Sequence, residues 1–95
     1  MKVEQTNRGF DIAEFKDKYG EQCSLQKSSL ATEDCIWLGI SKPKLTVFEN
    51  SNKGKYLVAD MPDNMSVNAR MHLTRDMVKE LLPYLTKFVE TGDID

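Results

Sequence analysis

The chain has 95 residues, a formal net charge of −2 and a charged fraction of 29%. This length predicts one small domain with a modest core and no deep two-layer enzyme cleft. The near-neutral charge argues against nonspecific binding to nucleic acid or to an anionic membrane, which needs a basic excess. No apolar run could span a bilayer and the N-terminus is polar, so we expect neither a membrane segment nor a signal peptide.

The first predicted elements form a β-hairpin. Residues 1–9 are polar and are expected to be a flexible N-terminus, followed by a single domain over residues 10–95. Residues 10–15 alternate imperfectly, and a bulge before Phe15 would explain the slip. The turn residues at 17–21 include Gly20, and residues 23–28 then alternate cleanly, with Cys23 and Leu25 on one face.

The middle of the chain predicts further strands. Residues 35–40 form an almost continuous apolar run, typical of a central strand covered on both faces. Residues 45–48 and 56–59 predict a second hairpin around a polar loop, and residues 60–69 a loop that returns to the sheet. Residues 70–73 predict the last strand, with Met71 and Leu73 turned inward.

A C-terminal amphipathic helix follows at once. Thr74 is a suitable N-cap, Asp76 suits the positive end of the helix dipole, and Gly92 is placed to end the helix. Apolar residues recur at helical spacing between these ends and predict a face for core packing. Pro83 predicts a kink that bends the helix over the sheet, with two shorter helices as the alternative. The predicted fold class is α+β: an antiparallel sheet of about five or six strands packed against one C-terminal amphipathic helix.

No residue pattern indicates catalysis or a metal. Cys23 and Cys35 are too few for a disulfide framework and are expected to be buried free thiols, which predicts a cytoplasmic protein. His72 is the sole histidine, and no glycine-rich elbow surrounds a serine. Zinc spacing, a phosphate-binding loop and a dinucleotide fingerprint are also missing from the sequence, so we expect no cofactor and no enzyme activity.

A set of polar residues is the candidate ligand site. Arg70 and His72 point away from Met71 and Leu73, and Arg75 lies at the helix start. Arginines and a helix N-terminus bind phosphate or carboxylate groups. If their strands are neighbours, the candidate residues are Arg70, His72, Arg75, Thr74, Ser28, Ser29, Gln26 and Trp37. The same pattern also fits a solvated sheet face with Arg70 paired to an acidic residue, and Trp37 also fits the core.

Several runs of the sequence are specific as an ordered set. They are residues 19–20, 23–31, 36–39, 70–75, 81–83 and 88–92. In these runs the chain resembles a family of short proteins encoded by tailed bacteriophages, over most of residues 10–92 and least over residues 43–69. The resemblance implies a phage protein made in the host bacterial cytoplasm, and it assigns no activity or functional residue.

The leading functional hypothesis is a counter-defence binding protein that sequesters an anionic nucleotide-type immune signal without catalysis. We expect it to be a homo-oligomer, because so small a domain encloses a nucleotide more easily across a subunit interface. The alternative is an inhibitor that binds a host defence or regulatory protein through a sheet edge or through Trp37. A small nucleotide-processing enzyme that uses His72 is a third hypothesis.

Overall fold

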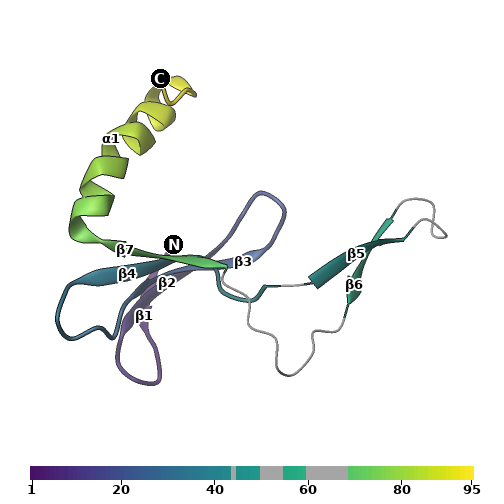
Figure 1. The fold of residues 1–95 in the computed structure, drawn as a ribbon, viewed down its shortest axis with the longest axis horizontal. Coiled ribbons are helices and arrows are strands. Elements are labelled where there is room, and N and C mark those ends of the chain that lie inside the picture. Colours follow the sequence, from purple (N-terminus) through teal and green to yellow (C-terminus); the bar gives the residue numbers. More distant parts are fainter. Residues whose placement is uncertain (44, 50–54, 60–68) are drawn as a thin grey trace.

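The described part of the chain forms one five-stranded sheet, one two-stranded sheet and one C-terminal helix (Figure 1). The computed structural model describes residues 1–43, 45–49, 55–59 and 69–95. The large sheet is antiparallel in the order β1-β2-β3-β4-β7. Its strands are β1 (Val3–Gln5), β2 (Asp11–Lys16), β3 (Gln22–Lys27), β4 (Cys35–Ile40) and β7 (Arg70–Thr74). With α1 (Arg75–Thr91), this arrangement confirms the α+β class.

The second predicted hairpin is present, but it does not join the large sheet. Strands β5 (Leu45–Glu49) and β6 (Lys55–Ala59) pair antiparallel with each other as a separate two-stranded sheet. The loop predicted at 50–54, and residues 60–68 of the loop predicted at 60–69, lie outside the described residues.

The sheet begins earlier than expected. Val3 pairs with Ala13 and Gln5 with Asp11, so part of the segment expected to be a flexible N-terminus is an edge strand. A tight turn joins it to β2: the Thr6 N–H donates to the Phe10 carbonyl at 2.8 Å, and the Thr6 hydroxyl accepts from the Phe10 N–H at 3.1 Å. Gly9 takes a φ of 85°, a conformation that other residues adopt only with strain. These local bonds make a polar segment part of the domain.

The hairpin of β2 and β3 is confirmed, without the expected bulge. The Asp17 carboxylate accepts from the N–H groups of Tyr19 and Glu21, both at 2.9 Å, which closes the turn. Pairing then runs without interruption through β2, and the slip disappears because Ile12 lies on the opposite face from Ala13 and Phe15.

Strand register gives the large sheet one apolar and one polar face, since directly opposed residues share a face. One apolar row crosses all its strands: Val3, Ala13, Leu25, Leu38 and Met71. We call the face that carries this row, with its neighbours Phe15, Cys23, Ile36, Ile40 and Leu73, the apolar sheet face. The opposite face carries the row Glu4, Ile12, Gln26, Trp37 and His72 and is the polar sheet face.

The helix has the predicted ends. The Thr74 hydroxyl accepts from the Met77 N–H at 3.2 Å, and Gly92 ends the helix at φ 81° with its N–H bonded to the Phe88 carbonyl at 2.8 Å. α1 passes through Pro83 as one element and is not split into two helices.

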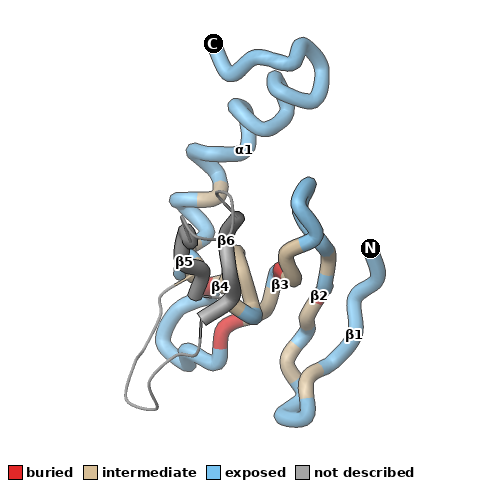
Figure 2. Tube along the Cα trace, turned by 90° about the vertical axis from the view of Figure 1, so that its right-hand side faces the viewer, coloured by how far each residue is buried: buried red, intermediate tan, exposed pale blue. Residues whose placement is uncertain are grey.

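The helix does not cover the sheet, contrary to the expected core packing. No residue of α1 is buried, and the helix leaves the end of β7 and extends away from the strands (Figures 1 and 2). The cause is the connection: β7 ends at Thr74 and α1 begins at Arg75, so no loop residue is available for the chain to fold back. For the same reason β4 is not covered on both faces, and Ile36, Leu38 and Ile40 stay half-exposed.

Candidate functional site

The polar sheet face brings most of the predicted site residues together. Trp37 of β4 lies directly between Gln26 of β3 and His72 of β7 in the strand register. Arg70 donates from Nη1 to Oε1 of Gln26 at 2.9 Å, and His72 Nε2 shares a hydrogen bond with the Ser28 hydroxyl at 2.9 Å. Both bonds pass over β4, so side chains 44 positions apart in sequence form one cluster.

Trp37 is the centre of this cluster. Its ring stacks on the His72 ring with centroids 4.1 Å apart and an interplanar angle of 15°. The Arg70 guanidinium lies 5.1 Å from the Trp37 ring, within range of a cation–π contact. The hydrogen bond that Arg70 donates to Gln26 and its contact with the Trp37 ring therefore hold the guanidinium in place. An anion that binds there would cost less side-chain entropy.

A hollow of about 420 Å³ adjoins the cluster. The polar sheet face contributes Gln26, Trp37, Arg70 and, just beyond β3, Ser29 to its lining. The β1–β2 turn contributes Thr6, Asn7, Arg8 and Phe10. The Arg8 guanidinium lies 5.5 Å from the centre of the Phe10 ring, so each side of the hollow combines one arginine with one aromatic ring.

The sequence patterns did not predict that residues of this turn belong to the site. Polar composition made residues 1–9 look like a flexible end, and it drew attention away from Arg8 and Phe10. The usable signal was Thr6 followed by Gly9, a hydroxyl and a glycine at turn spacing.

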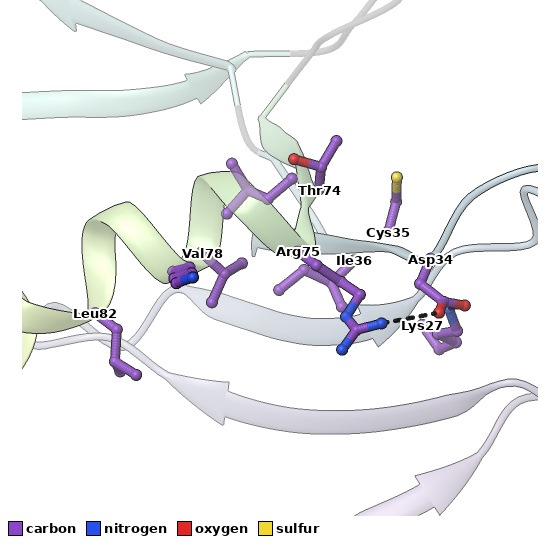
Figure 3. A pocket seen from close by; sticks show the side chains of 10 residues that line it. Lys27, Asp34, Cys35, Ile36, Thr74, Arg75, Val78 and Leu82 are labelled. Carbon is purple, nitrogen blue, oxygen red and sulfur yellow. Dashed lines mark hydrogen bonds and ion pairs between the residues drawn. The ribbon is translucent and has the colours of Figure 1, made fainter.

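Four of the predicted residues do not line the hollow: His72 and Ser28 belong to the cluster beside it, and Thr74 and Arg75 lie away from the cluster. The Thr74 hydroxyl caps α1, and neither Thr74 nor Arg75 lines the hollow. Arg75 instead points towards Asp34, with a nitrogen–oxygen distance of 4.0 Å (Figure 3). The hydrogen bond and charge of Lys27, and then the charge of Arg75, lower the pKa of Asp34, which stays an anion beside the helix start. The helix N-terminus is thus separate from the Arg70 cluster.

His72 and Cys35 are the groups near the cluster that nucleophilic catalysis could use. Among the described residues no carboxylate hydrogen-bonds to His72, so the Ser28–His72 pair has no acid to orient the ring. Burial raises the pKa of the Cys35 thiol, and the charge of Glu33 adds to the effect, which disfavours the nucleophilic thiolate. Within the described ranges no group of three or more His, Cys, Asp or Glu side chains is placed to hold a metal ion.

Ser24 gives a test of the packing beneath this face. Its hydroxyl is fully buried and has no hydrogen-bond partner among the described residues. Because an unpaired buried hydroxyl costs free energy, Ser24→Ala should raise the free energy of unfolding by about 1 kcal/mol in urea denaturation. Ser28→Ala is the matched control and should lower it by a similar amount, since the Ser28 hydroxyl bonds to His72 and to the Leu30 N–H. A loss of stability in Ser24→Ala would contradict this account.

No protein-family model, curated protein or solved structure matches the chain. In the part of the chain that the structure describes, no helix is long and apolar enough to cross a membrane.

Proposed function

We propose that this chain binds and sequesters an anionic nucleotide-type ligand, without catalysis, as a phage counter-defence protein. The observation that carries the proposal is the hollow, in which two arginines and two aromatic rings line one space of about 420 Å³. That size lies within the range of small-molecule sites. The phage setting comes from the family resemblance of the sequence.

The chemistry of the lining suits the two halves of a nucleotide. Guanidinium groups bind phosphate oxygens through paired, charge-assisted hydrogen bonds, and Arg8 and Arg70 approach the hollow from different elements. Trp37 and Phe10 supply flat apolar surface for a base. Gln26, Ser29 and Asn7 add donors and acceptors at the same walls.

Among the described residues, no carboxylate hydrogen-bonds to His72. This supports a protein that holds its ligand and does not convert it. The stack on Trp37 and the bond to Ser28 give His72 a role in fixing the wall of the site. A sequestering protein needs such a fixed wall and no acid–base pair.

The test is native mass spectrometry of the protein purified from infected cells that carry nucleotide-based immunity. The expected result is a bound mass of a few hundred daltons that is released intact on denaturation. Arg70→Ala should lower the affinity for the released compound about tenfold to fiftyfold in calorimetry, because one charge-assisted contact is lost.

Arg75→Ala is the matched control, since it removes the same side chain from a position outside the hollow. It should bind as the parent does. Equal affinity in all three proteins would rule out the Arg70 site. A bound host polypeptide in place of a small mass would support the alternative, a protein inhibitor.

A further inference from the structure

The apolar surface of α1 is exposed along its whole length. Phe88 is 55% exposed, Leu85 48% and Met77 51%. The whole helix is exposed except near its start (Figure 2). The apolar residues of α1 form a band wider than the seam of a two-helix coiled coil. They are Met77, Val78, Leu81, Leu82, Tyr84, Leu85, Phe88 and Val89. We call this set the helix stripe. A stripe this wide is typical of a helix laid on a broad apolar surface, since a two-helix seam covers only its centre.

The apolar sheet face is likewise left uncovered. Met71 is 53% exposed, Val3 65% and Leu25 37%, although all three belong to the row that crosses the sheet. An antiparallel sheet with one apolar face requires a second layer to cover that face. Each chain therefore carries one uncovered helix stripe and one uncovered sheet face.

The chain's own helix cannot supply this layer. β7 passes into α1 at Thr74 with no intervening residue, so the helix continues outward from the end of the strand. Only its first turns meet the sheet, where Val78 and Leu82 face Ile36 and Leu73 across an apolar groove of about 380 Å³ (Figure 3). At this groove the helix covers the edge of the apolar sheet face, and beyond it the helix leaves the rest of that face uncovered.

The chain exposes more surface than a compact monomer of its mass. The chain exposes 8241 Å², whereas a compact monomer of 10.9 kDa exposes about 5,600 Å². The excess of roughly 2,700 Å² is spread over the whole chain, and the ~800 Å² that each partner buries in a standard interface is less than a third of it. A net charge of −2 adds little repulsion between copies.

We infer that two copies of this chain form a two-fold dimer in which the helix stripe of each copy covers the apolar sheet face of the other. A second copy fits best because it carries both missing surfaces, so one two-fold operation covers both faces of both chains and closes the assembly. The partner helix also fills the groove beside Val78 and Leu82. The inference stands apart from the proposed ligand, because the dimer uses the face opposite to Trp37 and Arg70.

The first measurement is sedimentation velocity of the full chain from micromolar to nanomolar concentration. The expected species at micromolar concentration has twice the chain mass. Leu85→Glu in the helix stripe and Met71→Glu on the apolar sheet face should each raise the dimer dissociation constant at least a hundredfold, because each places a charge in the interface. Lys87→Glu is the control on the side of α1 away from the helix stripe, and it should leave the dissociation constant within about twofold.

Isotope-filtered NMR of mixed labelled and unlabelled wild-type chains avoids the risk that a variant fails to fold. Contacts between chains should join methyl groups of the helix stripe to those of Ile36, Leu38 and Met71. The inference is wrong if the wild type is monomeric throughout, or if contacts between chains join helix to helix alone. Dissociation by Leu85→Glu but not by Met71→Glu, or a different polypeptide bound in place of the second copy, also overturns it.

Discussion

Gly39→Ala is expected to lower the free energy of unfolding by about 3 kcal/mol, from backbone strain and steric overlap together. Gly39 has a φ of 148°, which residues with a Cβ rarely adopt. A Cβ there would overlap the Ala69 carbonyl oxygen and lie 2.8 Å from the Arg70 Cα. Both neighbours are backbone atoms, of the first residue of the paired strand β7 and of the residue just before it, so no side-chain rotation relieves the overlap. Urea unfolding followed by Trp37 fluorescence measures the loss.

Gly20→Ala separates the two contributions. Gly20 also has a positive φ, of 84°, but no atom lies within 4 Å of the position a Cβ would take. Its substitution should cost about 1 kcal/mol, the strain alone. Equal losses at both positions, compared at one protein concentration, would show that the contact between β4 and β7 is looser than described.

Trp37→Ala is expected to weaken binding of the nucleotide-type ligand about a hundredfold, the largest effect of any single side chain at the hollow. The substitution removes aromatic wall from the hollow, and it also removes the ring on which His72 stacks and over which Arg70 lies. Arg70 then keeps only its bond to Gln26 and loses part of its preorganisation. Calorimetric titration with the released compound measures the change.

Two variants bracket this result. Trp37→Phe keeps a flat ring and should lose no more than about tenfold, because stacking depends on the aromatic face. Tyr19→Ala removes an exposed aromatic ring in the β2–β3 turn, away from the hollow, and should change nothing. If Trp37→Ala binds like the parent, the ligand does not use this wall.

Local patterns predicted the elements well. Alternation at 23–28 gave β3 with Cys23 and Leu25 on one face, and Thr74 and Gly92 marked both helix ends. These features depend on residues close in sequence, so periodicity and capping chemistry suffice. Covering of the sheet by the helix was a wrong prediction, although the sequence held the reason: Thr74 serves both as the last strand residue and as the N-cap.

The candidate site was only partly predictable. Alternation placed Gln26, Ser28, Arg70 and His72 on outward faces, but only strand order and register show that β4 lies between them. That register depends on pairings between distant segments, which no local pattern encodes. Arg75 was assigned by proximity in sequence, and the turn at the helix start takes it to Asp34 instead.

The abrupt passage from β7 into α1 has a consequence for cooperativity. A helix of 17 residues with no buried side chain is only marginally stable in water by itself. If the proposed dimer supplies the packing for α1, order in the helix depends on protein concentration, whereas the hydrogen bonds of the sheet are formed within each chain. In the proposed dimer, dilution would therefore release α1 before it disturbs the Arg70 cluster, whose hydrogen bond and ring contacts join β3, β4 and β7 within one chain.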